Sequence, residues 1–117
     1  MAKSKVSIPT EVRVEIQKLI EKFNSENFND EDFRELNTIG YSARFKGKYL
    51  YLDRDDLGKP SPICRLTWNG TMANWDFAIY KYSDNHYDPD EWFFPGSGLV
   101  DGTVHGAMKA GMEAYQM

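Results

Sequence analysis

The fold of this chain is constrained most by two runs in which apolar residues alternate, ICRLTW at 63–68 and WDFAIYKYS at 75–83. Every second side chain of a strand points to the same face, so a one-residue slip in register would move the apolar set to solvent. One antiparallel register brings three apolar pairs together: Trp68 with Trp75, Leu66 with Phe77, and Cys64 with Ile79. The two runs are therefore predicted to be neighbouring strands that share a core face.

An earlier segment, YSARFKGKYLYLDR at 41–54, has the composition of a β-hairpin. We expect Lys46 and Gly47 to form its two-residue turn, because glycine tolerates positive φ. That turn sets the cross-strand pairs: Phe45 with Lys48, Arg44 with Tyr49, Ala43 with Leu50, and Ser42 with Tyr51. The apolar positions then gather on one core face: Tyr41, Ala43, Phe45, Leu50 and Leu52.

Three other segments have less regular patterns. DRDDLGKPSP at 53–62 predicts a loop, because it is rich in Asp, Gly and Pro. The polar stretch 28–37 could hold one short helical turn. The aromatic triplet 92–94 either forms a short fifth strand or caps the edge of the core.

Helical periodicity appears at both ends of the chain. An N-terminal helix is indicated by apolar residues at helical spacing: Val12, Ile16, Leu19, Ile20 and Phe23. Pro9 fits its first turn, and Ser7 is a candidate cap. A C-terminal helix over about 101–116 is indicated by a second stripe: Val100, Val104, Ala107, Met108, Gly111, Met112 and Tyr115. Glycines in its interior, such as Gly106 and Gly111, indicate close approach to the sheet or to a partner.

The order of these elements predicts a single α+β domain over residues 1–117. It consists of an N-terminal helix, a four- to five-stranded antiparallel meander sheet and a C-terminal helix, packed in two layers with both helices on one face. The alternative places one helix on each face of the sheet.

Charge and cysteine content limit the environment and the partners. The lone cysteine, Cys64, excludes an internal disulfide. The N-terminus lacks an apolar signal-peptide core, and no apolar run reaches about 18 residues. These features predict a cytoplasmic protein with no membrane association. The net charge of −4 makes nucleic acid an unlikely partner, because phosphate-backbone binding needs clustered Lys and Arg.

The predicted register gathers tyrosines and arginines on the sheet face that turns away from the core. This Tyr/Arg face consists of Arg44, Tyr49, Tyr51, Arg65, Tyr80 and Tyr82. Tyr and Arg are enriched at binding surfaces, so the face is predicted to bind a protein or small-molecule partner, self-association into a homodimer included. Two alternatives stay open: stacking of single-stranded nucleic acid, and tyrosines that serve only as strand formers.

A second candidate site lies in the acidic loop 84–91. His86, Asp88, Asp90 and Glu91 are candidate metal ligands, and a small metal-binding protein or enzyme centred there is the competing function. The same Asp-Pro-Asp pattern is common in turns. No nucleophile, base and orienting group can be assembled from spacing, so the predicted module is non-enzymatic, with no catalytic residue and no cofactor.

Most of the chain, residues 41–115, resembles a family of small microbial proteins without an established activity. The resemblance is carried by the runs RFKGKYLYLDRDD, PICRLTWNG and NWDFAIYKYSDNHYDPDEWFFPGSG. In its helix–meander–helix layout and acidic balance, the chain also resembles the frataxin-like fold. That resemblance implies an iron site of acidic residues on the first helix and the adjoining edge. The first helix of this chain is charge-balanced, so no residue is carried over.

Overall fold

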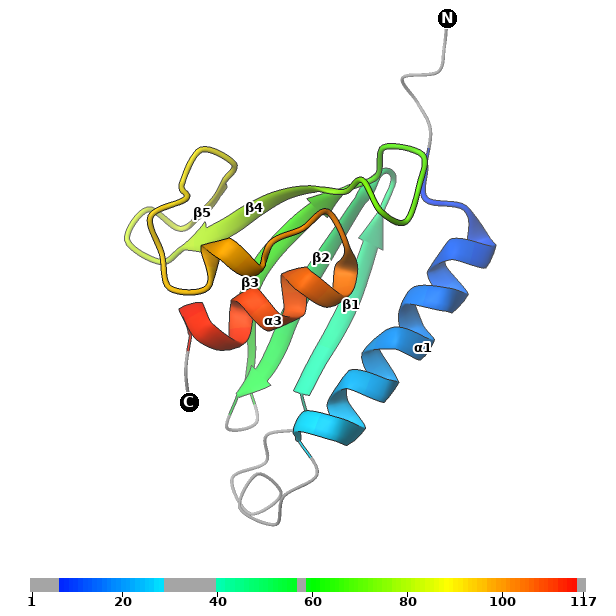
Figure 1. The fold of residues 1–117 in the computed structure, drawn as a ribbon, viewed down its shortest axis with the longest axis horizontal. Helices are drawn as coiled ribbons and strands as arrows, with labels where there is room; N and C mark the ends of the chain where they lie inside the picture. The colour runs from blue at the N-terminus through cyan, green and yellow to red at the C-terminus, as the bar shows by residue number, and fades with distance from the viewer. Residues whose placement is uncertain (1–6, 29–39, 57–58, 116–117) are drawn as a thin grey trace, which may run out of the picture.

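A computed structural model describes residues 7–28, 40–56 and 59–115, and the candidate helical turn at 28–37 falls almost wholly outside these ranges. The described elements follow one another along the chain (Figure 1): α1 (Thr10–Asn27), β1 (Gly40–Lys46), β2 (Tyr49–Asp56), β3 (Lys59–Thr67), β4 (Asp76–Lys81), β5 (His86–Asp88), the 3₁₀ turn η2 (Ser97–Leu99) and α3 (Val104–Ala114).

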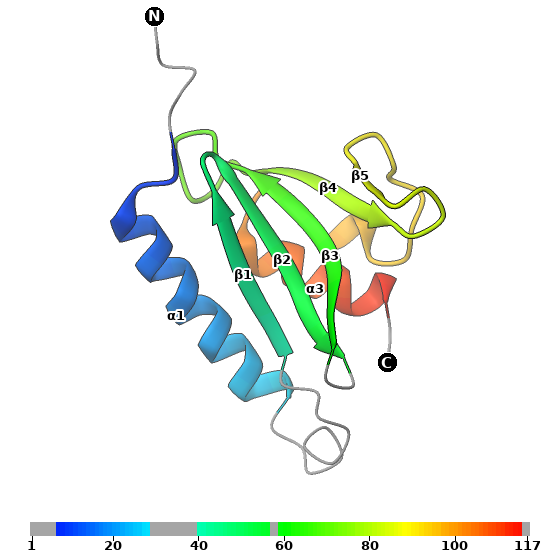
Figure 2. The ribbon, with the colours of Figure 1, turned by 180° about the vertical axis from the view of Figure 1, so that it is seen from behind.

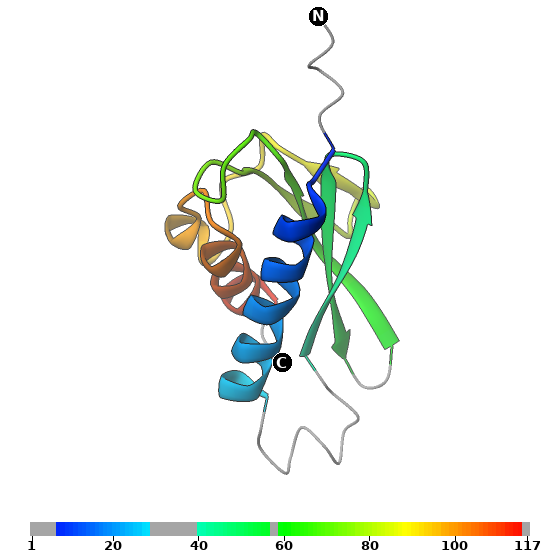
Figure 3. The ribbon, with the colours of Figure 1, turned by 90° about the vertical axis from the view of Figure 1, so that its right-hand side faces the viewer.

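The strands form one antiparallel sheet in the order β1-β2-β3-β4-β5, and α1 and α3 cover the same face of it. Figure 3 shows both helices on one side of the strands, and Figure 2 shows the other face, which we call the open face. The predicted two-layer α+β fold is confirmed. The alternative of one helix on each face is wrong.

Register was predicted correctly for β3 and β4 but not for β1 and β2. Cys64 pairs with Ile79 and Leu66 with Phe77, as the apolar alternation requires. In the first hairpin, however, Phe45 pairs with Leu50, because the turn is Gly47-Lys48 and not Lys46-Gly47. The shift is two residues, and a two-residue shift keeps every side chain on its predicted face.

The predicted loop at 53–62 is wrong, because β2 continues to Asp56 and β3 begins at Lys59. A bulge between Leu52 and Asp53 interrupts their pairing. Beyond it, Arg54 is only 2% exposed and donates a hydrogen bond to the Tyr115 carbonyl at the end of α3. Packing against α3 therefore orders a stretch whose composition favours a turn.

The fifth strand is His86–Asp88 and does not include the aromatic triplet 92–94. Trp92 and Phe94 instead lie 5.8 and 5.9 Å from the Phe77 ring, between ring centroids. Trp92 and Phe94 cap the edge of the core, which was the other expectation for the triplet, whereas Phe93 is exposed and takes no part in the cap.

The helix ends differ from the sequence-based boundaries. Pro9 itself occupies the N-cap of α1, so Ser7 is not the cap. Helix α3 begins at Val104, later than expected, because Thr103 is its N-cap and accepts a hydrogen bond from the Gly106 N–H at 3.0 Å.

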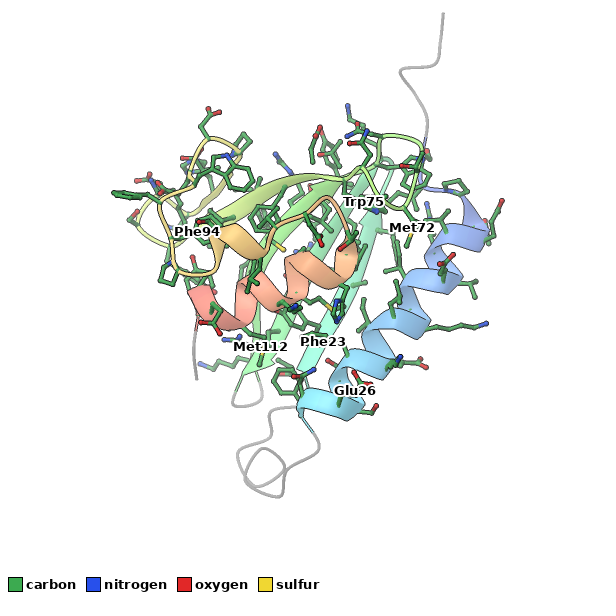
Figure 4. The ribbon with its side chains drawn as sticks, in the orientation of Figure 1. Phe23, Glu26, Met72, Trp75, Phe94 and Met112 are labelled. Atoms are coloured by element: carbon green, nitrogen blue, oxygen red, sulfur yellow. The ribbon has the colours of Figure 1, made fainter. Side chains whose placement is uncertain are left out.

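The core lies between the sheet and the two helices, with Phe23 of α1 pointing into it (Figure 4). Tyr41 donates from its hydroxyl to the Met108 carbonyl at 2.8 Å and crosses beneath α3. A Cβ added at Gly111 would overlap the Tyr41 hydroxyl and Ile63, so the expected close approach to the sheet occurs there.

Within the described residues, neither helix has the length and apolar character needed to cross a bilayer.

Candidate functional site

All six residues of the predicted Tyr/Arg face lie in one connected cluster on the open face. The tyrosine rings contact one another in a row across the sheet, with centroid distances of 6.2 Å (Tyr49 to Tyr51), 5.3 Å (Tyr51 to Tyr87), 4.9 Å (Tyr87 to Tyr80) and 4.9 Å (Tyr80 to Tyr82). The sequence interpretation missed Tyr87. This residue joins the cluster because β5 pairs Tyr87 directly with Tyr80.

Arg44 is held at one end of the cluster by an ion pair within the protein. Its Nε lies 2.6 Å from Oδ2 of Asp53 and its Nη2 lies 3.2 Å from Oδ1, a two-point contact. The Asp53 side chain is 8% exposed and that of Arg44 57% exposed. The hydrogen bond to Asp53 raises the pKa of Arg44, although partial burial opposes it. The charge of Arg44 is therefore already compensated.

Arg65 lies at the centre of the cluster in a different environment. Its Cζ is 5.0 Å from the Tyr49 ring centroid and 5.6 Å from that of Tyr87, so aromatic rings flank the guanidinium. Across the described ranges no carboxylate lies within ion-pair distance of it, and its buried Nε has no hydrogen-bond acceptor. Arg65 thus carries an uncompensated positive charge and an unsatisfied donor.

The tyrosine rings are tilted against one another, with interplanar angles of 78° (Tyr80 to Tyr82), 69° (Tyr80 to Tyr87) and 59° (Tyr51 to Tyr87). In such edge-to-face packing, the faces of the rings are partly used by their neighbours. Burial raises the pKa of Tyr87, Asp53 raises it further, and Arg44 opposes the shift. The phenol of Tyr87 is therefore neutral at physiological pH and available as a hydrogen-bond group.

Tyr82 ties the cluster to neighbouring segments. Its hydroxyl donates to the Pro62 carbonyl at 2.9 Å, and its ring lies 5.3 Å from that of Tyr115. Tyr115 in turn donates to the Tyr80 carbonyl. The C-terminal end of α3 thus supports the edge of the Tyr/Arg face.

The acidic loop is organised around a lysine that the sequence interpretation did not include. Lys81 Nζ lies 3.3 Å from Glu91, 3.8 Å from Asp88 and 3.8 Å from Asp84. Hydrogen bonding to Glu91 is the main cause of the raised pKa of Lys81. The ammonium group therefore occupies the position among the carboxylates that a bound cation would need.

Two further carboxylate oxygens of this loop accept hydrogen bonds from its own backbone. Asp88 Oδ1 accepts from the Asp90 N–H at 2.9 Å, and Glu91 Oε2 accepts from the Phe93 N–H at 3.0 Å. His86 lies 3.8 Å from Asp88 and is exposed. In the part of the chain that the structure describes, no group of three or more His, Cys, Asp or Glu side chains is placed to hold a metal ion.

One sequence signal could have revealed Tyr87. Lys81 and His86 flank a short stretch that contains Asp84 and Asn85, residue types that favour turns, and Asn85 adopts a positive φ of 52° in the structure. A tight turn there would have paired Tyr80 with Tyr87 and added Tyr87 to the Tyr/Arg face.

Comparison of the chain with protein-family models, with curated proteins and with solved structures found no match.

Proposed function

We propose that this protein is a non-enzymatic binding module whose Tyr/Arg face receives an acidic segment of a protein partner. The observation that carries the proposal is the environment of Arg65, a cation flanked by tyrosine rings without a carboxylate among the described residues. A charged group in this position is costly unless a partner completes it.

A carboxylate is the group that Arg65 is best suited to bind. A guanidinium has five N–H donors in a planar fork, and carboxylates match it with two parallel hydrogen bonds. The flanking rings of Tyr49 and Tyr87 would fix the plane of the fork before binding, which reduces the entropy lost on association. Arg44, already paired with Asp53, would contribute contact area more than charge.

The ring geometry supports a polypeptide over single-stranded nucleic acid. Base stacking requires open ring faces, whereas the rings of Tyr51, Tyr80 and Tyr87 are tilted against one another, so that their faces are partly used by neighbouring rings. The net charge of −4 would also repel a phosphate backbone. The competing proposal of a metal-binding or catalytic loop has less support, because Lys81 already lies among the carboxylates.

The proposal includes a cytoplasmic location. Its support is the lone cysteine, Cys64, which is fully buried and whose thiol pKa is raised by that burial. Such a thiol is poorly reactive, so it indicates neither a disulfide nor a redox role.

Selection from a random peptide library displayed on yeast tests the proposal, and the natural partner need not be identified for it. The immobilised wild-type protein should enrich peptides that contain Asp or Glu. Arg65→Gln should weaken the binding of those peptides by at least about tenfold, since a charge-assisted bidentate contact is lost. Lys18→Gln, which removes one charge from the exposed side of α1, is the matched control and should bind like wild type.

Two outcomes would contradict the proposal. One is enrichment of peptides without acidic residues. The other is equal binding of the acidic peptides by wild type and Arg65→Gln. Competition by an oligonucleotide in place of the peptides would favour the nucleic-acid alternative.

A further inference from the structure

The aromatic triplet 92–94 displays one side chain in an unusual way. Phe93 is 98% exposed, while its neighbours are anchored: Trp92 and Phe94 stack with each other and against Phe77. Phe94 lies beside η2, at the end of the sheet remote from α1 (Figure 4). Phe93 contributes nothing to the core, and with the exposed Trp92 (46%) and Tyr82 (47%) it is one of three large exposed apolar side chains in this region; contiguous exposed apolar patches mark interaction sites.

The exposure of Phe93 does not come from a loose loop. Its N–H donates to Glu91 at 3.0 Å, and Glu91 in turn lies 3.3 Å from Lys81. Farther along, Gly96 has φ 90°, and a Cβ there would overlap Ala110 and Glu113 of α3. The segment is pinned on both sides of Phe93, which therefore projects from a fixed ridge.

A hollow of about 290 Å³ lies directly beside this ridge. Most of its walls are apolar or aromatic: Ile79, Tyr82, Phe94, Ala114 and Tyr115, with Phe93 itself at the rim. A cavity of about 150 Å³ is enough to hold a benzene ring. A phenyl side chain from another molecule would therefore fit the hollow.

We propose that two copies of this chain associate by exchanging Phe93, with the phenyl ring of each copy seated in the hollow of the other. A projecting side chain and a matching hollow on one patch are self-complementary, and a two-fold axis between them satisfies both at once. Such an interface is closed, so association stops at the dimer.

The charges around the hollow are compatible with a second copy of the chain as the binding partner. The hollow contains one cation, Lys81, and one anion, Glu91, and these already pair with each other. Two like patches can therefore meet without an uncompensated charge in the hollow. A partner of another kind, such as an anionic membrane, would meet the acidic Asp88 and Asp90 beside the ridge.

The available apolar area sets the expected strength. Trp92 is 46% exposed and Tyr82 47% exposed, and both flank the fully exposed Phe93. Together they offer roughly half of the 800 Å² per partner typical of a stable complex. We therefore expect a reversible dimer with a Kd of about 1–100 μM.

Sedimentation velocity over a concentration series from about 1 μM to 1 mM tests the proposal. Wild type should convert from monomer to dimer, and Phe93→Ala should raise the dimer Kd at least about 100-fold, since both copies lose the central side chain. Val14→Ala is the matched control: Val14 is 51% exposed on α1, and its truncation should leave the dimer Kd unchanged.

A mixing experiment separates exchange of Phe93 from any other mode of association. Ala114→Phe places a larger side chain in the wall of the hollow, fills it and should also give a monomer. If Ala114→Phe does not fold, Ser83→Trp fills the same hollow from another wall. Phe93→Ala mixed with either filled variant restores one of the two contacts. Loss of both Phe93 contacts raises the dimer Kd about 100-fold, so loss of one contact should raise it by the square root of that factor. The Kd of the mixed dimer should therefore be about tenfold higher than that of the wild-type dimer.

A monomeric wild type at 1 mM, an unchanged Kd for Phe93→Ala, or a mixture no more associated than its components would each overturn the proposal. The two proposals share Tyr82, which lines the hollow and belongs to the Tyr/Arg face, but different residues test them. Arg65→Gln should dimerise like wild type, and Phe93→Ala should bind acidic peptides like wild type.

Discussion

Two cations lie in opposite environments in this molecule. Lys81 is surrounded by carboxylates, with Glu91 at 3.3 Å and Asp84 and Asp88 at 3.8 Å. Arg65 is flanked by the rings of Tyr49 and Tyr87 and has no carboxylate within ion-pair distance among the described residues. The acidic loop has an excess of negative charge around its cation, whereas the Tyr/Arg face has a cation that forms no ion pair within the described part of the chain.

The difference separates a structural cluster from a candidate binding site. Carboxylates that look like metal ligands in the sequence are paired with a lysine of the same chain, and Asp88 and Glu91 also accept hydrogen bonds from the backbone of the turn. The tyrosines that look like ordinary strand residues surround a guanidinium that has no carboxylate partner among residues 7–28, 40–56 and 59–115. A residue type alone therefore indicates a site less well than whether the fold satisfies its charge and hydrogen bonds.

The largest effect is expected from Tyr87→Ala, which would remove the ring that joins the tyrosines of the Tyr/Arg face to Arg65. Its ring contacts Tyr51, Tyr80 and Arg65, so its removal should lower the free energy of unfolding by about 2–3 kcal/mol. Urea denaturation followed by tryptophan fluorescence measures the change. His86→Ala, at the adjacent exposed position, is the control and should lie within about 0.5 kcal/mol of wild type. Equal losses for both variants would mean that Tyr87 is not integral to the cluster.

Lys81→Met would remove the cation that the carboxylates of the acidic loop surround. Asp84, Asp88 and Glu91 would then lack their positive partner, and we expect them to gain affinity for Ca²⁺. About 10 mM CaCl₂ should raise the Tm of this variant by roughly 3 °C and leave wild type unchanged. Lys109→Met, on the exposed side of α3, controls for the loss of one positive charge. A rise of the same size in wild type would revive the metal-binding alternative.

Arg65→Met distinguishes a role of Arg65 in binding from a role in folding. Methionine keeps much of the volume and removes a half-buried charge, so the free energy of unfolding should stay within about 1 kcal/mol of wild type or rise. Binding of selected acidic peptides should be lost in the same variant. A large destabilisation with intact peptide binding would assign Arg65 to the fold and not to the site.

The smallest effect concerns alkaline pH. The folded-state pKa of Tyr87 is raised, so its contribution to stability is complete below the unfolded value of about 10 and is lost as the pH rises through the folded value. The urea midpoint of wild type should therefore fall between about pH 9 and pH 11. Tyr87→Phe keeps the ring but cannot ionise, so its midpoint should fall less. Parallel curves for the two proteins would show that Tyr87 does not contribute.

Sequence reasoning predicted the parts of the fold and site that depend on local periodicity. The alternation in 63–68 and 75–83 gave the correct pairing of Leu66 with Phe77, because a one-residue slip would expose apolar side chains and this register brings three apolar pairs together. The six residues of the Tyr/Arg face were assigned to the correct side even though the first hairpin is two residues out of register, since a shift of two preserves the face. Composition failed at 53–62, where burial of Arg54 against α3 outweighed the turn preference of Asp, Gly and Pro.

The sequence by itself determined the alternation, the two helical stripes and hence the two-layer fold, because these follow from the repeat of backbone geometry along a single segment. Only the tertiary structure decided which charges are compensated and which side chains project. Tyr87 reaches Arg65 through the pairing of β5, Lys81 meets Glu91 across a chain reversal, and Phe93 projects because its two neighbours pack inward. These contacts join residues whose distance depends on how the chain turns back, a property that no local pattern encodes.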